Sequence, residues 1–165
     1  PVLPIWGEGR TRDWLAGMVV NEPRIYTKNT PTIAATGAGA GEVEVGFVNH
    51  YYLHRFLAEE GEGFAARNYF LPGGDPGSAV LVTGAAILKT ADNSTQAERF
   101  LEYLLSADAQ KYFAEETYEY PLIDGVPHAE LLPELVSPKT PDIDVSDLGD
   151  LAATQDLLRE VGASP

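Results

Sequence analysis

The feature of this sequence that most constrains its fold is the apolar run from residue 80 to residue 88, Val-Leu-Val-Thr-Gly-Ala-Ala-Ile-Leu. Residues 61 to 76 before it are rich in glycine and proline, which predicts a loop with residues 68 to 71 as an edge strand inside it. A short apolar run bounded by turn residues is typical of a buried strand. Residues 43 to 48 have the alternating, β-branched pattern of a second buried strand. The two runs therefore predict a sheet.

Helical patterns alternate with these runs. The predicted helix starts are Thr11, Thr30 with Pro31, Leu53, Thr95 with Glu98, Ser106 and Asp147. Residues 126 to 144 are rich in proline and acidic side chains, which predicts an extended surface path before the last helix. Helices that alternate with strands favour an α/β fold with a largely parallel sheet covered by helices.

Charge and composition exclude several classes of function. The sequence has 11 basic and 25 acidic residues, so its net charge of −14 repels nucleic acid and anionic lipid surfaces. It has no cysteine, so a metal ion would have to be held by oxygen or nitrogen. No apolar run approaches the roughly 18 to 20 residues of a membrane span. The sequence begins at Pro1 rather than at methionine, which predicts processing or truncation upstream.

The most informative residues are Asn49, His50, Tyr51 and Tyr52, placed where the predicted strand 43 to 48 ends. In open α/β sheets, ligands bind outside the carboxyl ends of the strands. Phenolate oxygens are hard donors that suit trivalent iron, which can hold them deprotonated although free tyrosine has a pKa of about 10. The alternative is that both rings merely cover the sheet. Spacing alone leaves both interpretations open.

Other polar side chains offer weaker candidates. His50 and His54 lie four residues apart but complete no zinc pattern, and solvated histidines are the favoured interpretation, while His128 is expected to be inert. A hydrolase could use Glu59, Asp75 or Ser78, but the sequence has no nucleophile elbow, triad order or phosphate-binding glycine loop to support one. The acidic residues in and beside the predicted loop 61 to 76 are expected to form a solvated surface.

The segment Val48-Asn49-His50-Tyr51-Tyr52-Leu53 resembles the tyrosine-pair motif of bacterial ferric-iron-binding periplasmic proteins. Further segments resemble that family in the same order along the chain: Trp6-Gly7-Glu8, Lys28-Asn29-Thr30-Pro31, Gly41-Glu42-Val43, residues 97 to 106, and Tyr118-Glu119-Tyr120-Pro121-Leu122. The ordered set covers most of residues 4 to 126. It favours the ferric interpretation of the tyrosine pair over the packing interpretation.

This resemblance implies a type II periplasmic-binding-protein fold, incomplete and limited to its C-terminal portion, with a mixed sheet covered by helices. Such a protein is not an enzyme; it binds Fe³⁺ together with a synergistic anion and delivers the iron to the permease of an ABC importer. Tyr51 and Tyr52 match the iron-ligating tyrosines, and Asn49 and Asn29 match anion contacts. The remaining ligands of the family are histidine, glutamate or tyrosine from the other lobe, upstream of this chain.

The resemblance also implies how the chain is divided. Residues 1–80 and 129–165 would belong to the second lobe, and residues 81–128 would cross to the first. Exposed sheet edges in such a fragment favour a homodimer or a domain swap. The expected location is extracytoplasmic, either periplasmic or anchored at the cell surface. A solute-binding protein for another ligand, such as an organic anion or a polyamine, is the alternative function.

Overall fold

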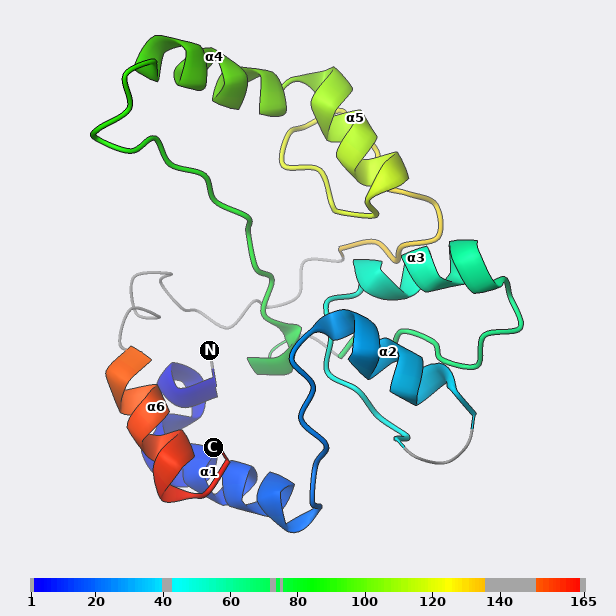
Figure 1. The fold of residues 1–165 in the computed structure, drawn as a ribbon, viewed down its shortest axis with the longest axis vertical. Helices are drawn as coiled ribbons and strands as arrows, with labels where there is room; N and C mark the ends of the chain where they lie inside the picture. The colour runs from blue at the N-terminus through cyan, green and yellow to red at the C-terminus, as the bar shows by residue number, and fades with distance from the viewer. Residues whose placement is uncertain (1, 40–42, 72–73, 75, 136–150, 164–165) are drawn as a thin grey trace. The chain divides into compact units, whose positions relative to one another are not determined.

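A computed structural model describes residues 2–39, 43–71, 74, 76–135 and 151–163. In these ranges the chain forms six α-helices and one 3₁₀ helix. Their bounds are α1 Val2–Val20, α2 Asn29–Gly37, α3 Tyr51–Glu60, η1 Pro76–Ser78, α4 Ser94–Leu104, α5 Ala107–Glu116 and α6 Leu151–Glu160 (Figure 1). The predicted helices are thus present, although the predicted start of the last one at Asp147 lies outside the described residues.

Several helix starts differ from the sequence prediction. Thr11 does not cap a helix; it lies inside α1, where its hydroxyl donates to the Gly7 carbonyl oxygen at 2.7 Å. The break in α1 is at Gly7 itself, whose φ of 74° is readily adopted only by glycine. Ser106 does cap α5, because its Oγ accepts a hydrogen bond from the Ala109 amide at 3.3 Å.

The predicted mixed sheet is not found in the described residues. Residues 43 to 48, 68 to 71 and 80 to 88 are irregular there (Figure 1). The apolar side chains of runs 43 to 48 and 80 to 88, predicted to be buried, are largely open to solvent: Phe47 is 67% exposed, Leu81 74% and Leu88 75%. A strand is stabilised by hydrogen bonds to a neighbouring strand, and the described residues form no such ladder for these runs.

The chain divides into two compact units. One contains residues 1–27, 69–81 and 135–165, and the other contains residues 28–68 and 82–134. In this division residues 28–68 and residues 1–27 belong to different units, whereas the lobes predicted from the resemblance assign both to the second lobe. Because lobes are defined by complete proteins of the family, the predicted lobe boundaries remain a prediction.

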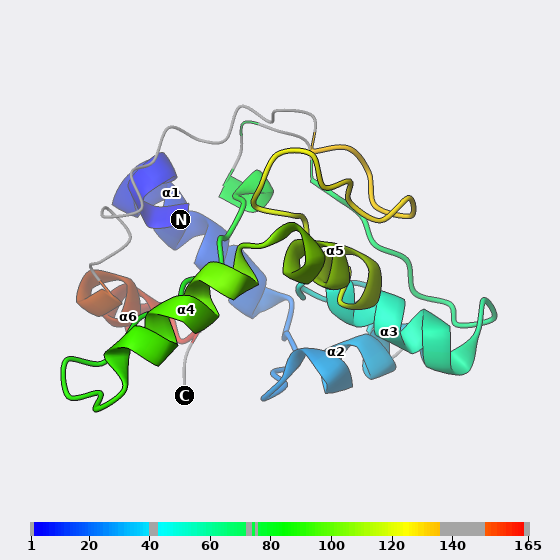
Figure 2. The same ribbon diagram turned by 90° about the horizontal axis from the view of Figure 1, so that it is seen from above.

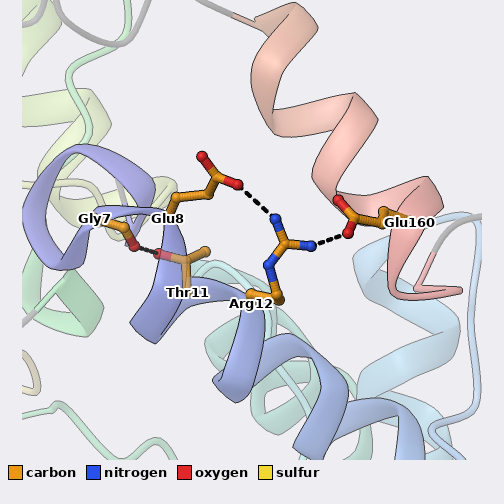
Figure 3. Close-up of polar contacts among 5 residues, drawn as sticks. All are labelled: Gly7, Glu8, Thr11, Arg12 and Glu160. Carbon is orange, nitrogen blue, oxygen red and sulfur yellow. Dashed lines mark hydrogen bonds and ion pairs between the residues drawn. The ribbon is translucent and has the colours of Figure 1, made fainter.

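The first unit is built on contacts of α1 with η1 and with α6. The guanidinium of Arg12 forms ion pairs with Glu8 on its own helix and with Glu160 on α6 (Figure 3). Leu157 of α6 is buried, and the rings of Trp6 and Trp14 meet edge to face with centroids 6.1 Å apart. The ion pair between Arg12 and Glu160 therefore links α6 to α1.

The second unit contains the tyrosine pair. Helices α2 and α3 lie side by side in both views, with Ile33 of α2 and Leu53 of α3 buried (Figure 2). The segment before α3 passes close to α2 at Gly46, where a Cβ atom would lie 2.8 Å from the Thr36 hydroxyl oxygen. The approach at Gly46 lies by the last turn of α2, whereas the Asn49 amide donates to Asn29 at the first residue of that helix, so the segment that leads into α3 runs back along α2.

Candidate functional site

Tyr51 and Tyr52 are the first two residues of α3. The Tyr52 amide donates to the Asn49 carbonyl oxygen and the Leu53 amide to the His50 carbonyl oxygen, both at 3.3 Å. The two rings lie with centroids 4.6 Å apart and planes tilted by 33°. Both side chains are half-buried. The turn into the helix thus places two neighbouring phenols on one side of the chain, which a regular strand would not do.

Asn49 and Asn29 lie at the same site. The Asn49 side-chain amide donates to the Tyr51 hydroxyl oxygen at 3.1 Å, and its backbone amide donates to Asn29 Oδ1 at 3.3 Å. Asn29 is the first residue of α2, so the contact between α2 and α3 brings it next to Asn49 although 20 residues separate them. The four site residues that the family resemblance implied, Asn29, Asn49, Tyr51 and Tyr52, therefore lie together.

Two histidines that were expected to be solvated contact the protein instead. His50 Nε2 lies 2.7 Å from the Tyr118 carbonyl oxygen, and His54 Nε2 lies 3.3 Å from Nδ2 of Asn68. Burial lowers the pKa of His54, and the nearby charge of His50 lowers it further. No local sequence pattern signals these contacts, because the partners lie 68 and 14 residues away along the chain.

A second aromatic segment, residues 118 to 120, contacts His50 beside the site. The Tyr120 ring lies 5.6 Å from the His50 ring, and its hydroxyl donates to the Pro133 carbonyl oxygen at 2.7 Å. Burial raises the pKa of Tyr120, with a smaller contribution from the carboxylate of Glu134. The Tyr118 backbone has a φ of 59°, an uncommon conformation for a residue other than glycine. Residues 118 to 120, which are distant in the sequence, thus contact the residue that precedes the tyrosine pair.

A positive charge lies beside the two rings. The Arg55 guanidinium lies 6.0 Å from the Tyr51 ring centroid and 5.8 Å from that of Tyr52, one helical turn further along α3. Its side chain is exposed. An exposed cation beside two phenols is compatible with an anion bound at the same place.

The chemistry available here is that of an oxygen-donor site. Two phenol oxygens and the amide oxygen of an asparagine are hard ligands, and adjacent phenolates match a hard trivalent cation. Among the residues that the structure describes, no three histidine or acidic side chains cluster as a metal site would require.

The residues considered for hydrolysis are Glu59, Ser78 and Asp75. Glu59 lies near the exposed end of α3, and Ser78 ends η1 in the other unit. Asp75 lies outside the described residues.

Residues 10–111 match the family model of bacterial extracellular solute-binding proteins. The match covers more than half of the chain, so this chain belongs to that family. Its members are named for the binding of solutes outside the cell. No described helix is long and apolar enough to cross a membrane.

More specific similarities are to iron proteins. The chain is 40% identical to iron uptake protein A2 of Synechocystis sp., over 97% of this chain and 48% of that protein. It is 28% identical to the major ferric iron-binding protein of Neisseria meningitidis serogroup B, over 98% of this chain and 48% of the relative. The predicted resemblance to ferric-iron-binding proteins is thereby confirmed.

Solved structures give the same result. Iron-bound HitA from Pseudomonas aeruginosa superposes with a TM-score of 0.83 at 31% identity, covering 98% of this chain and 51% of HitA. The Trichodesmium protein IdiA (FutA), in complex with iron and citrate, gives a TM-score of 0.77 at 33% identity. It covers 97% of this chain and 52% of that protein. The chain thus spans about half the length of the iron-binding proteins it matches, which have the predicted type II periplasmic-binding-protein fold.

Proposed function

We propose that this chain carries the tyrosine part of a ferric-iron site, in a protein that captures iron outside the cytoplasm and delivers it to an ABC importer. The observation that supports this most is the pairing of Tyr51 and Tyr52 at the start of α3, with the Asn49 amide on the Tyr51 hydroxyl. The relatives named for ferric iron and the iron-bound structural neighbours support the choice of metal.

In this proposal Tyr51 and Tyr52 are iron ligands, and Asn49 and Asn29 contact a synergistic anion. The neighbour that holds both iron and citrate supports an anion beside the metal. The exposed Arg55 adds positive charge near the place where that anion would lie. The remaining coordination positions would be filled by water, by the anion, or by ligands from the part of the relatives that this chain does not span.

The same proposal extends to location and partners. Membership of an extracellular family supports a periplasmic or surface-anchored protein that docks on a permease. The exposed apolar residues of runs 43 to 48 and 80 to 88 support association of the chain, as a homodimer or by exchange of these segments.

Titration with ferric nitrilotriacetate, followed in the visible range, tests the iron proposal. Charge transfer from phenolate to ferric iron gives a red-brown band, which should saturate with the parent chain. The band should disappear when Tyr51→Phe and Tyr52→Phe are combined. The matched control combines Tyr103→Phe and Tyr112→Phe, which remove two hydroxyls from side chains that are each 58% exposed in the same unit.

The control variant should keep the band. A parent chain that stays colourless, or a band that survives without Tyr51 and Tyr52, would overturn the ferric proposal. Binding of an organic anion or a polyamine that persists in the double tyrosine variant would then favour a solute-binding protein for that ligand.

A further inference from the structure

Asn68 lies in the loop after α3, and its half-buried side chain contacts the start of that helix. Its Nδ2 atom is 2.9 Å from the His50 carbonyl oxygen and 3.3 Å from His54 Nε2. Both partners flank the tyrosine pair, one residue before Tyr51 and two residues after Tyr52. One carboxamide therefore spans the turn that carries both phenols.

The orientation of this amide follows from its partners. A backbone carbonyl oxygen can only accept, so the NH₂ group of Asn68 must face His50. The second N–H of the same group can then donate to His54, whose Nε2 accepts when the ring proton is on Nδ1. The two N–H groups of Asn68 thus serve His54 on α3 and His50, the residue that precedes α3.

His50 is the residue at which this contact matters for the tyrosines. It precedes α3 and makes no side-chain cap on it, while its ring Nε2 lies 2.7 Å from the Tyr118 carbonyl oxygen. Its own carbonyl oxygen accepts from both the Leu53 amide and Asn68. Because the first turn of a helix frays readily, a bond from a distant side chain to this carbonyl holds the peptide that aims Tyr51.

We propose that Asn68 is a positioning residue for the tyrosine pair: it does not touch the metal, and it holds the first turn of α3 so that both phenols face one cation. This inference rests on the proposed ferric function. Groups that orient metal ligands from outside the coordination shell typically change metal affinity by about 10- to 100-fold when they are removed.

The sharpest variant is Asn68→Asp, which keeps the shape of the side chain and replaces both donors by a carboxylate oxygen. Asn93→Asp is the matched control, because it makes the same change in the same unit, where Asn93 is exposed and its side chain makes no cap hydrogen bond. Asn68→Ala, which removes the donors without adding charge, is measured beside them. An Asn68 variant enters the comparison when its α5 amides exchange hydrogen as slowly as those of the parent chain.

Two readouts separate positioning from a general loss of stability. With ferric nitrilotriacetate, loss of Asn68 should weaken binding about 10- to 100-fold and shift the visible band, while Asn93→Asp leaves both unchanged. In the iron-free chain, hydrogen exchange should accelerate at the Tyr52 and Leu53 amides and stay unchanged in α5.

The outcomes also separate this inference from the proposed function. If the parent chain colours and the Asn68 variants match Asn93→Asp in both readouts, the positioning role is overturned and the ferric function stands. If the parent chain does not colour, the ferric function fails, and the exchange readout alone decides whether Asn68 holds the tyrosine turn. Unchanged exchange at Tyr52 and Leu53 overturns the positioning role in that case too.

Discussion

At the scale of single residues, Asn49 contacts the first phenol of the tyrosine pair. Its amide donates to the Tyr51 hydroxyl oxygen at 3.1 Å, and the same contact would stabilise a phenolate at that position. The backbone of Asn49 is in turn held by Asn29 Oδ1. The two asparagines thus form a short chain of hydrogen bonds that leads from α2 to the first phenol.

Replacing Asn49 by alanine should weaken ferric binding by about 10-fold, because it removes a donor from the ligand oxygen. It should also move the charge-transfer band to longer wavelength, because a phenolate without that donor gives up its electron more easily. Visible titration of the Asn49→Ala chain measures both effects. An unchanged band position would show that the amide does not contact the phenolate when iron is bound.

His128 provides a pH-dependent test at the same scale. Its Nδ1 lies 2.9 Å from the Ala129 carbonyl oxygen and its Nε2 lies 3.4 Å from the Glu134 carboxylate. Chiefly the carbonyl contact, and then the carboxylate, raise the pKa of His128 above its ordinary value of 6.5. Its stabilising contribution is therefore fully present below pH 6.5 and is lost as the pH rises through the higher folded-state pKa.

An NMR titration of the His128 ring should give a midpoint above 6.5 in the parent chain and a lower one in Glu134→Gln. Glu130→Gln removes the same charge from an exposed side chain nearby and should leave the midpoint unchanged. Equal shifts in both variants would mean that the general acidity of the segment, rather than Glu134, raises the pKa.

At the scale of elements, the packing of α2 against α3 determines where the site is built. The Phe64 ring lies over Gly37 at the end of α2, where a Cβ atom would come within 1.9 Å of the ring. The same ring stacks on Phe56 of α3, with centroids 5.3 Å apart. Gly37 therefore lets the loop after α3 fold back across both helices.

Gly37→Ala should destabilise the unit by about 1 to 3 kcal/mol, because the ring cannot move without giving up its stacking. Gly63→Ala is the control, since a Cβ atom there would meet no atom within 4 Å. Urea unfolding of both variants measures the difference. Similar midpoints for the two would show that Phe64 repacks at little cost.

The elements also show what could be predicted from the sequence. Helix patterns were reliable because periodicity and the Ser106 cap are local signals. The runs 43 to 48 and 80 to 88 have strand composition, but a strand depends on a neighbour that the described residues do not supply. Asn49, Tyr51 and Tyr52 were singled out because they stand in one short segment that resembles a known motif, which their spacing alone does not decide. Asn68 and Tyr118 were missed because only folding brings them to His50.

At the scale of the whole molecule, exposed apolar segments should govern association. Val82 is 68% exposed and Leu88 75%, both within the most apolar run of the chain. Unpaired apolar segments of this kind are sites of pairing with another chain. The proteins that this chain matches are about twice its length.

Sedimentation velocity over a wide concentration range should therefore show a dimer or larger species. Combining Val82→Lys with Leu88→Lys should shift the chain toward monomer, because it places charges in the pairing segment. Val20→Lys with Leu151→Lys adds the same charges to exposed apolar positions on helices, 80% and 66% exposed, and should not. A chain that is monomeric throughout would remove the case for segment exchange.

Resonance Raman spectroscopy of the iron-loaded chain tests most directly whether Tyr51 and Tyr52 bind ferric iron as phenolates. Excitation within the visible band should enhance tyrosinate ring vibrations. These vibrations should be weaker in either single phenylalanine variant and absent from the double variant. A visible band without enhanced tyrosinate vibrations, or vibrations that persist in the double variant, would contradict phenolate ligation by this pair.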